Sequence, residues 1–139
     1  MLKLQLCVLL AILLVRGREI DYIKPPQSEI SKLFEVSLTC ITETNIDADT
    51  IQKLLTWNVK NTEQIRKYLF CFMHKAKYAD DDGHFIIKNI MPLLGQHKKK
   101  DEFQRVIEQC NTLTGGDRFD TVYKISDCTY NKTPVYFTM

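Results

Sequence analysis

The chain has 139 residues, which is enough for one domain with a single hydrophobic core. Its 19 lysines and arginines nearly balance 17 aspartates and glutamates, giving a formal net charge of +2 at pH 7. This balance gives no electrostatic reason to expect a nucleic-acid partner, and no linker, repeat or low-complexity segment divides the chain.

Residues 1–17 have the pattern of a secretory signal peptide. A basic residue, Lys3, precedes a run of about twelve nearly all-apolar residues, which is shorter than the ~20 that span a bilayer. We expect cleavage after Gly17, so that residues 18–139 form a single domain that is secreted to the extracellular space. Cleavage would remove Cys7 and two basic residues, leaving a neutral chain with an even number of cysteines.

The next part of the chain has the apolar period of three amphipathic helices. Two prolines and Ser28 are start signals for the first helix, Asp49 can cap a short second helix, and Asn61 or Thr62 can open a third. The side chains expected to face the core are Ile30, Leu33, Phe34, Leu38 and Ile41 in the first helix, Ile51, Leu54 and Leu55 in the second, and Ile65, Leu69, Phe72, Met73 and Ala76 in the third.

Three more helices are expected in the second half. The almost continuously apolar run from Phe85 to Met91 indicates a buried fourth helix that Pro92 ends, because its ring disfavours helical geometry in the preceding residue. Asp101 begins a fifth helix, and Asp117 begins a sixth that ends near Cys128. The short apolar tail that follows is expected to fold back onto the body. The predicted fold class is all-α, a compact bundle of about six helices.

Four cysteines lie beyond the leader, Cys40, Cys71, Cys110 and Cys128, and no CxxC pair occurs among them. Widely spaced cysteines on the helices of an exported chain indicate disulfides that crosslink those helices. Four cysteines allow three pairings, which this reasoning leaves open.

The segment from Tyr78 to Asn89 shares features with a calcium-binding loop, because Asp80, Asp82 and Gly83 occupy matching positions. Tyr78 and Asn89 replace the acidic ligands at its two ends. We therefore expect an acidic turn that caps the fourth helix, and no metal site.

Catalytic motifs are also missing from the pattern. His74, His84 and His97 lie in different elements, and no serine occupies a strand-to-helix elbow. The basic run from His97 to Lys100 is expected to be a solvated loop, and Asn131 starts a glycosylation sequon. We expect neither an enzyme nor a bound cofactor.

With its helix-borne cysteines and the acidic turn after Cys71, the chain resembles insect odorant-binding proteins of the pheromone-binding and general odorant-binding family. That family has six ordered cysteines, with three residues between the second and third and eight between the fifth and sixth. Here the second and fifth positions hold Lys67 and Phe119. Both missing cysteines belong to one bridge, which is the pattern of the four-cysteine "minus-C" branch. Lys67 is expected to pair with Glu63 one helical turn before it.

The resemblance implies a disulfide pairing. Cys40 would bond to Cys71, joining the first helix to the third, and Cys110 would bond to Cys128, joining the fifth to the sixth. A crosslink that closes a loop of about 30 residues stabilises a protein by roughly 3–4 kcal/mol. Phe119 is expected to pack inward, but the contact between the third and sixth helices should be looser than in six-cysteine relatives.

The same resemblance implies an interior cavity for small hydrophobic odorants or semiochemicals, which the protein would carry through aqueous lymph toward a membrane receptor. Periodicity alone does not distinguish a cavity from a filled core. Release could follow acidification if His74 or His84 became charged and loosened the tail. The candidate lining residues are apolar and lie on the helical stripes: Trp57, Phe72, Met73, Ile90, Met91, Leu94, Val122 and Phe137.

A rival interpretation is a secreted helical signalling, venom or defence protein that acts through its surface and has a solid interior. Both interpretations are compatible with a monomer or a weak homodimer. They differ in one property, the entry of a small apolar probe into the protein.

Overall fold

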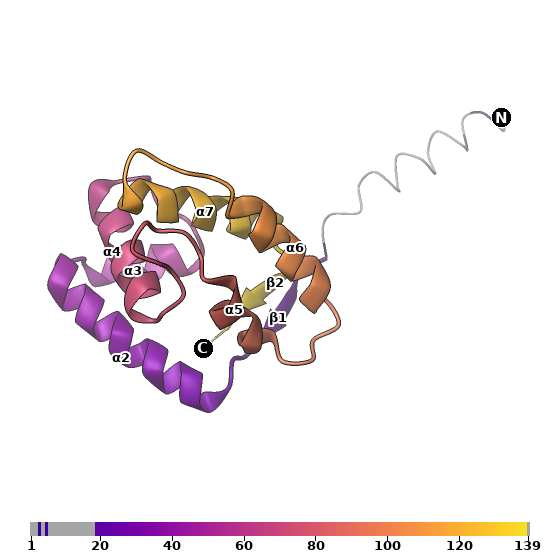
Figure 1. Cartoon of the computed structure of the whole chain (residues 1–139), viewed down its shortest axis with the longest axis horizontal. Coiled ribbons are helices and arrows are strands. Elements are labelled where there is room, and N and C mark those ends of the chain that lie inside the picture. The colour runs from indigo at the N-terminus through magenta and orange to yellow at the C-terminus, as the bar shows by residue number, and fades with distance from the viewer. Residues whose placement is uncertain (1–2, 4, 6–18, 139) are drawn as a thin grey trace.

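The structure, a computed structural model, describes residues 3, 5 and 19–138; the rest of the expected leader, including Cys7, lies outside the described residues. The protein is all-α with one small pair of strands, and Figure 1 shows how the elements are arranged. In chain order the elements are β1 (Asp21–Ile23), α2 (Gln27–Thr44), α3 (Ala48–Leu55), α4 (Glu63–Lys75), α5 (Ile87–Ile90), the 3₁₀ helix η1 (Met91–Leu94), α6 (Lys100–Cys110), α7 (Arg118–Lys132) and β2 (Val135–Phe137).

Helix α4 lies at the centre of the helical packing, because it contacts both α2 and α7. Helix α7 also packs against α6, so the two long C-terminal helices close the other side of the core. Within residues 3, 5 and 19–138, no helix combines the length and apolar character needed to cross a membrane. Side chains from α4, α6, α7 and β2 are almost fully buried, among them Ile65, Ile107, Val122, Ile125 and Val135.

Side-chain caps begin three of the helices. Thr62 and Asp117 each accept a hydrogen bond from the backbone N–H three residues on, at 3.3 and 2.8 Å, which confirms both as helix starts. The expected cap of α3 at Asp49 is wrong. Asp47 caps that helix instead, and Asp49 lies in the first turn, where it pairs with Lys53 at 3.0 Å.

The expected buried face of the first helix is partly wrong. Leu33 is buried as predicted, but Phe34 and Leu38 are 60% and 50% exposed. Cys40 must face α4 to form its disulfide, and this requirement turns Phe34 and Leu38 outward, since adjacent helical positions differ by about 100°. Leu55, expected to point inward from α3, is also exposed because it is the last residue of that helix.

The expected fourth helix is much shorter than predicted. Phe85 pairs with Ala79 in an isolated antiparallel bridge, and the Asn111 side chain bonds both its N–H and its C=O. Only one α-helical turn follows, and Pro92 does not end it. Proline lacks a backbone N–H, so it is accommodated in the first turn of η1, whose N–H groups need no helical partner.

The C-terminal tail folds back as predicted, but through a pairing that the sequence did not indicate. Helix α7 ends at Lys132, four residues after Cys128. The buried Thr133 hydroxyl then donates to the carbonyl of Val135. Beyond it, β2 runs parallel to β1, with the register Asp21 to Val135, Tyr22 to Tyr136 and Ile23 to Phe137.

The acidic segment forms the expected turn. The Asp80 carboxylate accepts hydrogen bonds from the N–H groups of Asp82 and His84, at 2.9 and 3.0 Å, so it caps this turn rather than a helix. Gly83 is buried under the start of α7 with a φ of 88°, and a Cβ there would collide with the Arg118 carbonyl. In the described part of the chain, no three His, Cys, Asp or Glu side chains converge to hold a metal ion.

Replacing Gly83 by alanine tests how tightly the turn is held against α7. Gly95→Ala is the matched control, because Gly95 also has a positive φ, 52°, but has open space where a Cβ would lie. We expect G95A to lower the free energy of unfolding by about 1–3 kcal/mol through backbone strain, and G83A to cost more because α7 must also shift. Urea unfolding measures both values, and equal losses would show that the turn can move away from α7.

Candidate functional site

Two disulfides connect the helices. Cys40 is bonded to Cys71 and Cys110 to Cys128, each with Cα atoms 5.7 Å apart. The predicted pairing is therefore confirmed. The first bridge ties α2 to α4, and the second ties the end of α6 to α7.

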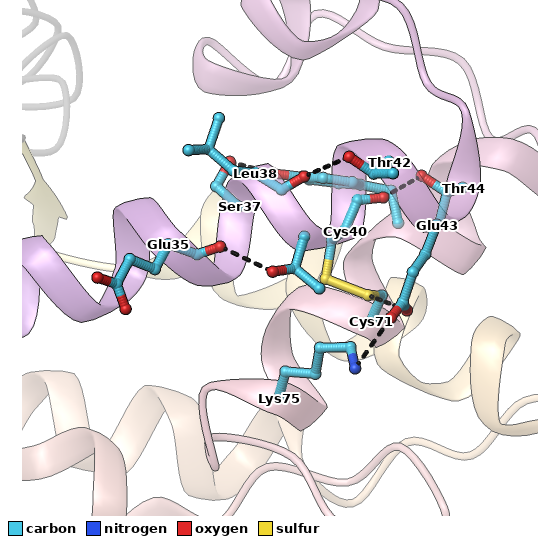
Figure 2. The surroundings of a disulfide bond; sticks show 11 residues. Glu35, Ser37, Leu38, Cys40, Thr42, Glu43, Thr44, Cys71 and Lys75 are labelled. Atoms are coloured by element: carbon cyan, nitrogen blue, oxygen red, sulfur yellow. Dashed lines mark hydrogen bonds and ion pairs between the residues drawn. A yellow bond between two sulfur atoms is a disulfide. The ribbon is translucent and has the colours of Figure 1, made fainter.

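The Cys40–Cys71 bridge is half exposed on its α4 side. Figure 2 shows Glu43 and Lys75 beside Cys71, where their charged groups lie 3.2 Å apart. The Glu43 carboxylate also comes within 3.4 Å of the Cys71 sulfur. This contact is not a hydrogen bond, because a disulfide sulfur carries no proton to donate.

No covalent bond joins α4 to α7 among the described residues, and aromatic packing is found at that contact. Lys67 extends to the surface and pairs with Glu63 at 2.7 Å, and this hydrogen bond holds the pKa of Glu63 below its ordinary value. The Phe119 ring meets the Phe70 ring edge-on, with centroids 5.2 Å apart. Arg118 places its guanidinium 4.7 and 5.0 Å from the same two rings. Phe119 packs inward as predicted.

We predict that this joint opens more readily than the rest of the helical core. The start of α7 is held to α4 by side-chain packing alone, whereas α6 is tied by Cys110 to the end of α7. Backbone amides of residues 122–126 should therefore exchange with solvent faster than those of residues 104–108, which lie mid-helix in α6. Hydrogen exchange followed by NMR gives both rates, and equal protection of the two segments would contradict a loose joint.

The eight candidate lining residues lie in or beside one hydrophobic cluster. Ile90, Leu94 and Val122 are buried within it. Phe137 is the most exposed of the eight, at 37%, and its ring contacts Phe103 edge-on at 5.8 Å. The other four are partly buried and pack against the cluster: Trp57, Phe72, Met73 and Met91.

Trp57 is fixed on the outer side of this cluster. Its indole N–H donates to the Asp127 carboxylate at 2.7 Å, and its ring stacks on Tyr123 and Tyr130, with centroids 5.9 and 5.6 Å away. Burial, together with the charge of Asp127, raises the pKa of Tyr123. Trp57 is the single tryptophan of the chain, so its fluorescence reports on this side of the core.

Two buried tyrosine hydroxyls already have partners within the protein. Tyr68 shares a hydrogen bond of 2.9 Å with Ser37, and Tyr78 donates to Glu29 at 2.7 Å. Burial, followed by the bond to Glu29, raises the pKa of Tyr78 far above its ordinary value. These contacts join α2 to α4 and to the acidic turn. Apolar periodicity could not identify them, because each joins residues more than 30 positions apart.

Two open pockets flank the start of α7, and none of the eight candidate residues lines either. One has a volume of about 660 Å³, and the other about 370 Å³. The only sequence signal for this region was the replacement of cysteines by Lys67 and Phe119. Arg118 and Phe119 line both pockets; the larger also includes Asp81, His84, Thr114 and Asp117, and the smaller Lys67, Phe70, Cys71 and Lys75.

Comparison with known proteins identifies the group to which this fold belongs. A family model described as the PBP/GOBP family matches residues 25–132. The chain belongs to the PBP/GOBP family. It is 26% identical to odorant-binding protein 10 of Aedes aegypti over 105 residues, which cover 72% of this chain and 74% of that protein.

Three solved structures have a similar fold. The Locusta migratoria odorant-binding protein lmigOBP1 matches with a TM-score of 0.67 and 22% identity, over 81% of this chain and 87% of its own. OBP56a, a fatty acid binding protein from the oral disk of the blowfly Phormia regina, matches with a TM-score of 0.65 and 20% identity, over 79% of this chain and 96% of its own. Odorant binding protein 7 of Anopheles gambiae, with four disulfides and an azo compound bound, matches with a TM-score of 0.64 and 17% identity. The match covers 76% of this chain and 86% of that protein's chain.

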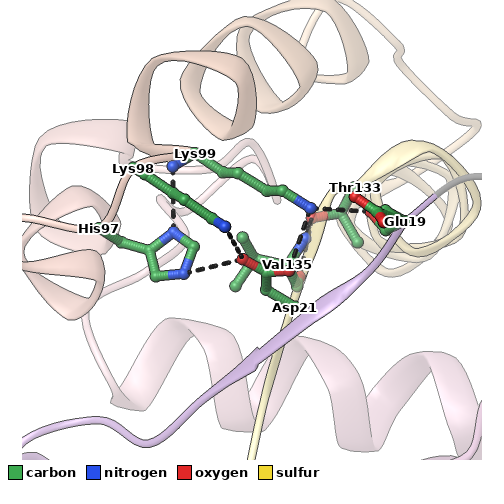
Figure 3. Close-up of polar contacts among 7 residues, drawn as sticks. All are labelled: Glu19, Asp21, His97, Lys98, Lys99, Thr133 and Val135. Atoms are coloured by element: carbon green, nitrogen blue, oxygen red, sulfur yellow. Dashed lines mark hydrogen bonds and ion pairs between the residues drawn. The ribbon is translucent and has the colours of Figure 1, made fainter.

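In this PBP/GOBP-family chain, an ion cluster holds the N-terminal strand beside the loop before α6. His97 and Lys99 approach the Asp21 carboxylate to 3.3 and 3.1 Å, and Lys98 approaches it to 3.9 Å (Figure 3). The Lys99 ammonium also donates to the Glu19 carbonyl. The expectation of a solvated basic loop is therefore partly wrong: Lys98 is 78% exposed, but the Lys99 side chain is only 16% exposed.

The histidines expected to trigger release have partners away from the C-terminal tail. His74 lies 2.8 Å from the Asp81 carboxylate. His84 bonds to the Leu113 carbonyl and the Thr114 hydroxyl. None of these partners belongs to β2, so they do not connect either histidine to the C-terminal tail. Acid-triggered release stays a prediction.

The Asp21 cluster leads to a pH-dependent prediction for the strand pair. The hydrogen bond from Lys99 holds the pKa of Asp21 below its ordinary value of 3.8. The stabilisation is therefore present above that pH and is lost as the carboxylate is protonated below it. We expect Asp21→Asn to lower the melting temperature at pH 7 and to lower it less at pH 3, because part of the stabilisation is lost once the pH falls below 3.8.

Lys98→Gln is the control for this measurement, because the Lys98 side chain is 78% exposed and lies farthest from Asp21. It should leave the melting temperature almost unchanged at both pH values. If the Asp21→Asn variant has the same melting temperature as the wild type at pH 7, the cluster does not stabilise the strand pair.

Proposed function

We propose that this protein is a secreted carrier that reversibly binds small hydrophobic molecules, such as odorants or other semiochemicals, in its interior. It would transport them through aqueous lymph toward membrane receptors. The observation that supports this most strongly is the single hydrophobic cluster held in the two-disulfide frame of a PBP/GOBP-family fold. The relative in Aedes aegypti is named as an odorant-binding protein, and the Anopheles gambiae structure holds an azo compound.

Binding would be a partition equilibrium without chemical reaction. A ligand gains about 25 cal/mol for each square ångström of apolar surface removed from water, less the free energy needed to order the site. Met73 and Met91 are suited to such a site, because flexible thioether side chains adapt to ligands of different shape. Both are partly buried against the core, so they can rearrange at lower cost than Ile90 or Val122.

We also propose that the chain is a four-cysteine "minus-C" member whose residues 1–17 are removed on export. Two features support this assignment. The four cysteines of the described region form two bridges, and Lys67 and Phe119, at the positions of the absent third bridge, make contacts that need no sulfur.

An alternative is a secreted signalling, venom or defence protein that acts through its surface. The exposed side chains of Phe34 and Leu38 favour it, since they lie one turn apart on the outer face of α2. Such a protein would need no interior site. The two proposals therefore predict different responses to a small apolar probe.

Titration with the uncharged fluorophore N-phenyl-1-naphthylamine, followed by displacement with candidate volatiles, tests the carrier proposal. We expect Met91→Gln to raise the dissociation constant of the probe at least about fivefold, because burying an amide beside an apolar ligand costs about 1–3 kcal/mol. Leu55→Gln is the control, since Leu55 is 69% exposed. Failure of the probe to enter at micromolar protein concentration would overturn the carrier proposal and favour a surface-acting protein.

A further inference from the structure

The smaller pocket beside α7 lies where the third disulfide of six-cysteine relatives would be. Both replacement residues, Lys67 from α4 and Phe119 from α7, line it. The pocket volume of about 370 Å³ is near the lower end of the range for small-molecule sites. This position therefore combines a concave surface with side chains that the six-cysteine pattern does not have.

The floor of this pocket is apolar. The Phe70 ring is 7% exposed and meets the Phe119 ring edge-on. The half-buried sulfur of Cys71 extends the same surface toward α2. A short hydrocarbon or aromatic group placed here would pack against the partly exposed Phe119 ring, beside the buried Phe70 ring.

The rim of the pocket is positively charged. Lys67, Lys75 and Arg118 line it, against a single carboxylate from Glu43. Lys67 is already paired with Glu63, and Lys75 with Glu43. Arg118 is different, because in the described part of the chain no carboxylate lies within ion-pair distance of its guanidinium.

The guanidinium of Arg118 is held in a position where it can bind an anion. The group lies 4.7 Å from the Phe70 ring centroid and 5.0 Å from that of Phe119. Cation–π contacts of this kind orient the guanidinium but leave its N–H groups able to form paired hydrogen bonds. The buried turn at Gly83 also packs against the Arg118 backbone, which limits movement of this residue.

We infer that the position of the absent disulfide is a second ligand site, on the surface, which binds a small amphipathic organic anion. The carboxylate or sulfate head group bonds to Arg118, and the apolar body lies on Phe70 and Phe119. This site is separate from the proposed interior site, because none of the eight interior candidates lines it. It selects for negative charge, whereas the interior cluster selects for apolar surface alone.

A matched pair of ligands, octanoate and 1-octanol, tests this site by NMR titration of the ¹⁵N-labelled protein. The two share an eight-carbon chain and differ in charge. We expect octanoate, but not 1-octanol, to shift the amide signals of Lys67, Cys71, Lys75 and residues 117–120, which lie at or beside the pocket and include none of the interior candidates. Shifts at residues 90–94 and 122 report instead on the interior site, so failure of one proposal is distinguishable from failure of the other.

Arg118→Gln should raise the dissociation constant of octanoate, measured at Lys67, Cys71 and Lys75, at least fivefold. Arg105→Gln is the control, because Arg105 is an exposed arginine on α6, away from the pocket. Arg118→Lys should bind octanoate with intermediate affinity, since it retains the charge but loses the paired donors. The proposal is overturned if octanoate leaves Lys67, Cys71, Lys75 and residues 117–120 unshifted, if 1-octanol shifts them equally, or if Arg118→Gln binds octanoate like the wild type.

Discussion

The disulfide between Cys40 and Cys71 determines how α2 lies on α4, and the packing of the other helices depends on that contact. Because both sulfur atoms must meet between the helices, the side of α2 that carries Leu33 and Cys40 turns inward. Helix α4 also packs against α7, where Phe70 meets Phe119. In the chain-entropy model a bridge of this span contributes roughly 3–4 kcal/mol, a large part of the 5–15 kcal/mol typical of a folded domain.

The contact between α4 and α7 has no disulfide among the described residues and is held by aromatic packing instead. An aromatic pair such as Phe70 and Phe119 contributes about 0.5–1.5 kcal/mol beyond its area burial, which is less than a disulfide. At the same contact Lys67 lies at the surface, and the guanidinium of Arg118 lies over the two rings. The contact between α4 and α7 thus lies beside an open pocket and a guanidinium without a carboxylate partner among the described residues.

Several features of the candidate site could not be predicted from sequence because they depend on distant residues. The strands are three residues long, too short for a recognisable alternating pattern. Asp21 meets Lys99 across 78 positions, and Trp57 meets Asp127 across 70. The pockets beside Phe119 depend on how α4 and α7 approach each other. The eight interior candidates were predictable as apolar residues of one cluster, but periodicity does not reveal whether they enclose space.

The sequence by itself determined the helical class, most helix starts, the cysteines available for bridges and the family resemblance. These properties depend on local signals, such as Thr62 and Asp117 accepting bonds from residues three positions on. Only the tertiary structure decided that Phe34 faces outward, that Pro92 lies inside a 3₁₀ turn, and that Arg118 lies over two rings. The physical reason is that side-chain direction and burial depend on contacts between helices, which no local period contains.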